Sequence, residues 1–142
     1  MESTMPSFTV QTIYLKDLSF ESPLSGMSTV QVGGIRFDAE FETKATNQDE
    51  NFYEVCLSLT GKGINEKDEI IYLVELTQAG TFYKEGEISE ELIKKATLAD
   101  CPTVLFPYLR ETVDSVLMKG GWPPITIAPI DFSSSYLAAQ NS

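Results

Sequence analysis

Carboxylates are the most numerous side chains here that could carry chemistry, with 21 Asp and Glu residues in a chain of 142. Three groups are close enough in sequence to act as acid–base pairs: Asp38 with Glu40 and Glu42, Asp68 with Glu69, and Glu90 with Glu91. General acid–base catalysis needs a carboxylate whose surroundings tune its pKa to the reaction. These groups instead fall on the polar side of an alternating run, in a turn and at a helix start. We interpret them as a hydrated acidic surface.

The sequence contains no histidine, which excludes the Ser-His-Asp triad, the Cys-His pair and imidazole metal ligands. Cys56 and Cys101 form neither a disulfide framework nor a four-cysteine zinc site, so we expect two small apolar residues. The glycines at 33–34 and 61–63 lack the Lys-Ser/Thr partner of a phosphate-binding loop. We therefore expect no catalytic residue, no metal and no cofactor. An enzyme that uses carboxylates or lysines is the alternative that the residues support least.

Length and charge narrow the class of protein further. A chain of 142 residues predicts one domain over residues 1–142. The net charge of −11 and the isoelectric point near 4.3 disfavour nucleic-acid binding and favour basic partners. The first ten residues lack the features of a secretory signal, and the longest apolar stretch, residues 69–78, is too short to span a membrane. These observations predict a soluble protein of the cytoplasm.

Apolar and polar residues alternate in the first half of the chain, which is typical of strands with one buried face. The clearest run is 35–44, where every second side chain is apolar or small: Ile35, Phe37, Ala39, Phe41 and Thr43. Residues 8–21, 52–60 and 69–78 show similar runs, with a turn expected over 61–68. Short links between the runs predict a meander of four adjacent antiparallel strands. In the first strand, alternation places Asp17, Ser19 and Glu21 opposite the aromatic residues.

The second half changes to helical spacing. Ser89, followed by two glutamates, resembles a helix start. A second helix is expected after Cys101-Pro102, with Pro107 in its first turn or at a kink and with an apolar stripe that includes Leu105, Leu109, Val113 and Val116. Strands followed by helices predict an α+β domain, a four-stranded antiparallel sheet with helices packed on one face.

Three aromatic residues surround a proline-rich segment near the end of the chain. Three prolines keep residues 122–129 extended, and Asp131 caps a last short helix in which Phe132 and Tyr136 are i,i+4 neighbours. Together with Trp122, these aromatic residues either pack in the core or line an exposed apolar groove for extended polypeptide. The residues alone leave both interpretations open.

Three segments of the chain match sequence patterns of one known protein family. Residues 13–23, IYLKDLSFESP, are close to the family pattern I-Y-x-K-D-x-S-F-E-x-P. Residues 75–82, ELTQAGTF, are similar to its E-V-x-Q-x-G-x-F strand. Residues 101–111, CPTVLFPYLRE, match C-P-x-x-L-F-P-Y-x-R-E, and the likeness continues to Phe132. The segments occur in the family's order and cover nearly the whole chain. The sequence therefore resembles the SecB family of bacterial protein-export chaperones.

The resemblance implies an ATP-independent chaperone that holds precursor proteins unfolded and delivers them to the SecA motor. It also implies a dimer of dimers, a homotetramer whose sheets join edge to edge and whose long helices pack between dimers through the stripe Leu105, Leu109, Val113 and Val116. SecA-binding positions correspond to Asp17, Glu21, Leu73 and Glu75. Client-groove positions correspond to Trp122, Ile125, Phe132, Tyr136 and Leu137.

Two departures from the family pattern leave an alternative open. The polar and acidic C-terminal extension that makes a second SecA contact in the family is absent, and residues 24–32 lack the usual aromatic-rich sequence. A SecB-like chaperone dedicated to another client, such as a toxin–antitoxin system, would have the same fold.

Overall fold

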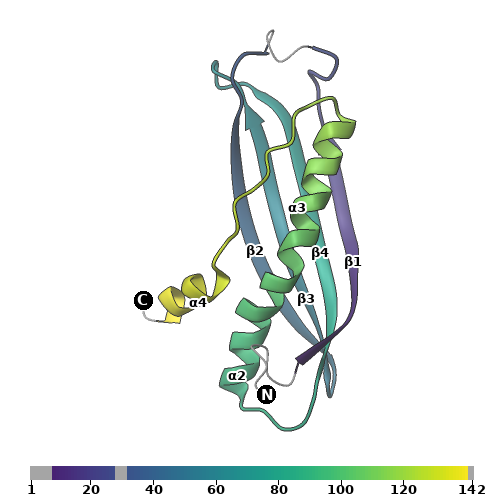
Figure 1. Cartoon of the computed structure of the whole chain (residues 1–142), viewed down its shortest axis with the longest axis vertical. Helices are drawn as coiled ribbons and strands as arrows, with labels where there is room; N and C mark the ends of the chain where they lie inside the picture. Colours follow the sequence, from purple (N-terminus) through teal and green to yellow (C-terminus); the bar gives the residue numbers. More distant parts are fainter. Residues whose placement is uncertain (1–7, 28–31, 141–142) are drawn as a thin grey trace.

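The computed structural model describes residues 8–27 and 32–140 of the chain. The expectation that the chain starts without a secretory signal concerns mainly residues outside this range. The described part contains a four-stranded antiparallel sheet, and the helices lie on one of its faces (Figure 1). The fold class predicted from the sequence is therefore confirmed for the protomer.

The strands are β1 (Phe8–Glu21), β2 (Arg36–Asp49), β3 (Phe52–Ile64) and β4 (Ile70–Lys84). Their order in the sheet is β1-β4-β3-β2, so the predicted meander is wrong for the first strand. β1 and β2 do not form a hairpin, because β4 and β3 lie between them in the sheet. Just after β1, the Ser22 hydroxyl accepts a hydrogen bond from Trp122 Nε1 (2.7 Å), and the Ser25 hydroxyl donates one to the Gly120 carbonyl (3.0 Å), so both serines bind the chain at the end of the long helix. β1 and β2 are therefore the two edges of the sheet.

Two bulges interrupt the alternation of β1. The register against β4 shifts between Val10 and Thr12 and again between Leu15 and Asp17. Each inserted residue reverses the faces of the residues that follow it. Tyr14 consequently points to the outer face, contrary to the simple alternation, whereas Phe20 points to the helix side and contacts Tyr72.

β3 continues through the glycines that were predicted to form a turn. Gly63 pairs with Tyr72 of β4, and a Cβ atom on Gly63 would lie 2.5 Å from the Tyr72 ring. Gly61 is approached in the same way by the ring of Phe37. These glycines let aromatic rings lie directly on the strand, so they extend it rather than end it. The turn follows at 65–69, where the Asn65 side chain accepts hydrogen bonds from two backbone N–H groups.

The two predicted helices form one continuous helical segment. α2 (Glu90–Lys95) starts at Ser89, whose hydroxyl caps the N–H of Leu92 as the sequence predicts. A wider π-helical turn, η1 (Ala96–Asp100), joins α2 to α3 (Cys101–Lys119). Pro107 lies inside α3 rather than in its first turn. A shorter helix, α4 (Phe132–Gln140), ends the described chain.

The apolar stripe of α3 packs against the sheet and forms the core of the protomer. Leu105, Leu109 and Val113 have no exposed surface, and Val116 is half-buried. The first three therefore offer no surface to another subunit, and their assignment to an oligomer interface is corrected. The mistake has a physical cause: the sheet is long enough to cover the whole stripe, because β3 and β4 extend beyond the predicted ends.

Candidate functional site: an apolar groove beside the edge strand

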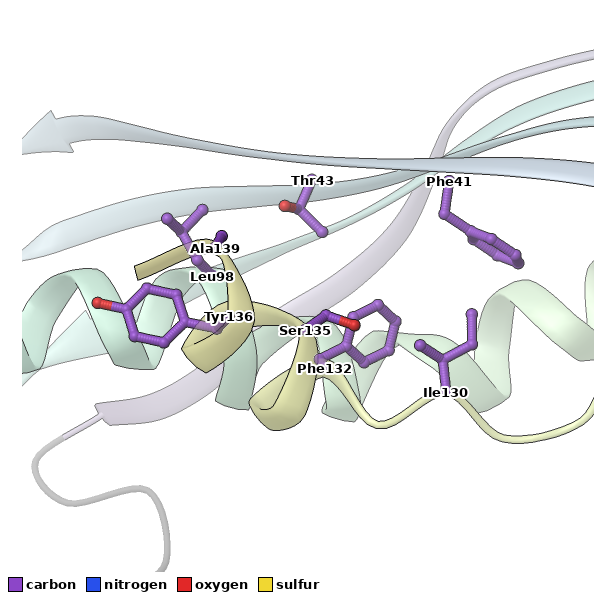
Figure 2. A pocket seen from close by; sticks show the side chains of 8 residues that line it. All are labelled: Phe41, Thr43, Leu98, Ile130, Phe132, Ser135, Tyr136 and Ala139. Carbon is purple, nitrogen blue, oxygen red and sulfur yellow. The ribbon is translucent and has the colours of Figure 1, made fainter. Parts of the chain in front are cut away.

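A groove of about 340 Å³ opens between edge strand β2, the π-helical turn η1 and helix α4 (Figure 2). It is lined mostly by apolar side chains: Phe41, Thr43, Leu98, Ile130, Phe132, Ser135, Tyr136 and Ala139. Figure 2 shows Phe132 and Ile130 lying below the β2 strand, with Phe41 and Thr43 projecting from that strand towards them. The groove thus joins residues that are almost a hundred positions apart in sequence.

Local interactions hold helix α4 at one wall of the groove. The Asp131 carboxylate caps α4 by accepting hydrogen bonds from the N–H (3.0 Å) and the hydroxyl (2.7 Å) of Ser134. These hydrogen bonds lower the pKa of Asp131. The Phe132 ring then packs edge-on against Phe106 of α3 at 6.2 Å, and Phe106 packs against Phe41 at 6.3 Å. Aromatic contacts therefore connect α4 through α3 to the edge strand.

The structure places two of the five predicted groove residues in this groove. Phe132 and Tyr136 line it, although Phe132 is itself largely buried. Trp122 belongs to the core: it is 3% exposed, packs against Tyr72 at 5.8 Å and donates its indole N–H to Ser22. Ile125 and Leu137 do not line the groove, and Leu137 is 55% exposed. The sequence prediction is therefore corrected for Trp122, whose side chain is buried in the core, whereas client contact by Ile125 and Leu137 stays a prediction.

Residues from earlier parts of the chain complete the groove. Phe41, Leu98 and Ile130 were not predicted as lining residues, because their contact with α4 depends on tertiary packing. The alternation of β2 did indicate that Phe41 has a buried side. A second hollow shares Thr43 and Leu98 with the groove and continues along β2 towards α2. The groove and the second hollow together therefore form a continuous depression along edge strand β2 that extends beyond α4.

The outer face of the sheet carries the four residues predicted to bind SecA. Asp17 and Glu21 of β1 lie on the same face as Leu73 and Glu75 of β4, with Glu21 directly opposite Leu73. The second bulge of β1 is what puts Asp17 on this side. All except Leu73 are exposed, and Leu73 is half-buried. An acidic, partly apolar patch results.

A polar cluster braces the outer face beside this patch. Tyr14 and Lys16 of β1 reach over β4 to Glu54 of β3, with the Tyr14 hydroxyl at 2.5 Å and Lys16 Nζ at 2.6 Å from its carboxylate oxygens. The hydrogen bonds from Lys16 and Tyr14 lower the pKa of Glu54. Burial and the hydrogen bond with Glu54 raise the pKa of Tyr14. The cluster fixes the bulged part of β1 that presents Asp17.

The two cysteines are poorly suited to nucleophilic chemistry. Cys101 is fully buried, and burial raises the pKa of its thiol. Burial also raises the pKa of the half-buried Cys56, and the nearby Glu54 carboxylate adds to this effect. Because the reactive form is the thiolate, both changes reduce the fraction that could react at neutral pH.

The family model described as preprotein translocase subunit SecB matches residues 1–142. The chain belongs to the SecB family. Curated relatives include the protein-export protein SecB of Marinomonas sp., which is 38% identical over 132 residues, or 93% of this chain and 82% of the relative. The SecB protein of Aromatoleum aromaticum is 33% identical over 139 residues, or 98% of this chain and 87% of the relative.

A solved structure shows the same fold in a distant SecB-like protein. The SecB-like chaperone of Mycobacterium tuberculosis, in complex with a peptide from an antitoxin, matches with a TM-score of 0.76 and 19% identity, covering 87% of this chain and 91% of that one. At this identity the comparison supports the SecB fold alone. Within the described residues of this SecB chain, no helix is long and apolar enough to cross a membrane.

Proposed function

We propose that this SecB-family protein is an ATP-independent chaperone of the cytoplasm, which holds precursor proteins unfolded for export. The apolar groove beside β2 is the observation that carries the proposal. It is open at the protomer surface and is lined by Phe41, Phe132 and Tyr136, which give contact area without a pocket specific to one sequence. An unfolded chain has apolar side chains to place there, whereas a folded protein has buried them.

Binding to unfolded and folded forms of one protein tests the proposal. A precursor held unfolded by reduction and alkylation is expected to bind in the absence of nucleotide, because its apolar side chains are accessible. The same precursor in its folded, oxidised form is the matched control, and titration calorimetry measures both. Equal affinity for the two forms, or a requirement for ATP, would contradict the proposal.

The acidic patch supports delivery to SecA. Asp17, Glu21, Leu73 and Glu75 combine negative charge with an apolar centre, which suits a short basic and apolar tail. The net charge of −11 would speed the encounter with a basic partner and make it sensitive to salt.

Reversing the charge of this patch tests the SecA contact. Asp17→Lys and Glu75→Lys are expected to weaken capture by an immobilised SecA tail peptide about tenfold or more, since a like charge replaces an attractive one. Glu111→Lys, an exposed position on α3, carries the same charge change away from the patch and should leave capture nearly unchanged. If both patch variants bind as the wild type does, the assignment is wrong. If the wild type itself is not captured, a chaperone dedicated to another client, such as an antitoxin, becomes the better proposal.

Exposed apolar residues support assembly as a dimer of dimers. On edge strand β1, Val10, Leu15 and Leu18 are 39–44% exposed on the helix side of the sheet, which suits edge-to-edge contact with a second sheet. On α3, Tyr108 and Met118 are more than half exposed, away from the buried stripe. These residues replace Leu105, Leu109 and Val113 as the proposed helix contacts between dimers.

A further inference from the structure

The extended segment between α3 and α4, residues 122–131, forms one border of the groove without belonging to a helix or strand. Figure 1 shows it running beside α3 down to α4. Pro123, Pro124 and Pro129 have no N–H to donate, so the segment has few ways to bind its neighbours through its own backbone. At its first residue the Trp122 N–H donates to the Leu117 carbonyl at 2.9 Å, and the position of its middle part depends on side chains of α3.

Two residues of α3 supply hydrogen bonds to the middle of this segment. The Asp114 carboxylate accepts from the N–H of Ile125 at 3.0 Å and from the N–H of Thr126 at 3.2 Å. One turn earlier on the helix, Arg110 Nη1 donates to the Ile127 carbonyl at 3.5 Å. Three consecutive residues of the segment are thus held by a carboxylate and a guanidinium from the same helix.

The backbone conformation at this point shows why such a hold is needed. Thr126 has a φ of +49°, a left-handed conformation that is unfavourable for a β-branched residue. A conformation of this kind persists only where the surroundings impose it. The N–H of Thr126 is one of the two groups bound by Asp114. The carboxylate therefore holds the segment at its most strained residue.

The same contacts lead to the wall of the groove. The Arg110 guanidinium lies 5.5 Å from the centre of the Phe106 ring, and Phe106 contacts both Phe41 and Phe132. Ile130, which lines the groove, lies three residues after Ile127. A shift of the segment would consequently move Ile130 and change the width of the groove.

We propose that Asp114 is a positioning residue for client binding: it clamps residues 125–127 onto α3 and so holds the Ile130 wall of the groove in place. The inference rests on the proposed role of the groove. Without the carboxylate, the N–H groups of Ile125 and Thr126 bind water, and the wall must be ordered each time a client enters. Lost preorganisation reduces affinity although no client contact has been removed.

Hydrogen exchange and peptide binding together test the clamp. In Asp114→Ala, the amides of Ile125 and Thr126 are expected to exchange about tenfold faster or more, because each amide loses its hydrogen bond to a charged carboxylate. Affinity for a fluorescein-labelled peptide of alternating leucine and serine, measured by anisotropy, should fall about tenfold. Asp114→Asn keeps one acceptor oxygen and should give smaller changes in both measurements.

The controls separate positioning from a general loss of stability. Exchange at the amides of α3 should remain as in the wild type, and Glu111→Ala, an exposed change on the same helix, should alter neither measurement. Unchanged exchange at Ile125 and Thr126 would overturn the clamp. Faster exchange with unchanged peptide affinity would overturn its role in the groove. If the wild type fails to bind the peptide, the proposed function fails. This result can be told apart from a failure of the clamp, because it is seen in the wild type without any variant.

Discussion

Replacing Leu109 with alanine is expected to lower the free energy of unfolding of the protomer by about 3 kcal/mol, within the usual range for a buried leucine. Leu109 has no exposed surface and lies at the centre of the α3 stripe against the sheet. The loss combines the removed apolar contact with the cavity left behind. Denaturant unfolding at several protein concentrations measures this loss of stability. The contribution of subunit association falls as the protein is diluted, whereas a loss of stability within the protomer does not depend on concentration.

Tyr108 provides the matched control for this experiment. It is adjacent to Leu109 but is 51% exposed on the outer side of α3. Tyr108→Ala is expected to change protomer stability by only about 0.5 kcal/mol, as surface substitutions usually do. In sedimentation experiments it should instead weaken the assembly. The reverse result, a stable Leu109→Ala protomer that no longer assembles, would restore the sequence-based assignment of Leu109 to the oligomer interface.

Filling the groove from its α4 side is expected to abolish most client binding. Ala139 lines the groove and is exposed, so a tryptophan there can occupy the space next to Tyr136 without entering the core. An indole buries on the order of 200 Å² and would displace a client side chain of similar size. Ala139→Trp should therefore weaken binding of the unfolded, alkylated precursor by more than about tenfold.

Ala138→Trp is the control for added bulk on the same helix. Ala138 is exposed and does not line the groove, so this variant should bind the precursor nearly as well as the wild type. Thermal unfolding should show both variants to be folded. Equal binding by the wild type and Ala139→Trp would mean that clients use another surface.

Local signals in the sequence predicted the parts of the fold that depend on neighbouring residues. The first strand has the predicted bounds, Phe8–Glu21, because its run of apolar and aromatic residues ends at a proline turn. Ser89 and Asp131 act as helix caps, as expected from side chains that accept hydrogen bonds from the first turn. The order of the strands could not be predicted in this way. Whether β1 pairs with β2 or with β4 depends on contacts between residues far apart in sequence, such as the hydrogen bond from Trp122 to Ser22.

The candidate site was only partly predictable for a related reason. The spacing of apolar residues identifies side chains that are buried from water, but it does not show whether they are buried against the sheet of the same chain or against another chain. Leu105 and Trp122 proved to be covered within the protomer, whereas Phe132 and Tyr136 line an open groove. Bulges also shift faces without a clear signal in composition, as Tyr14 shows.

Hydrogen exchange of the protein with and without the unfolded, alkylated precursor tests most directly whether the groove holds clients. With the precursor bound, we expect slower exchange in β2 around Phe41 and Thr43 and in α4 around Tyr136, since both border the groove. The outer strand residues around Glu21 and Glu75 should exchange as before. Protection confined to that outer face, with none in β2 and α4, would contradict the account.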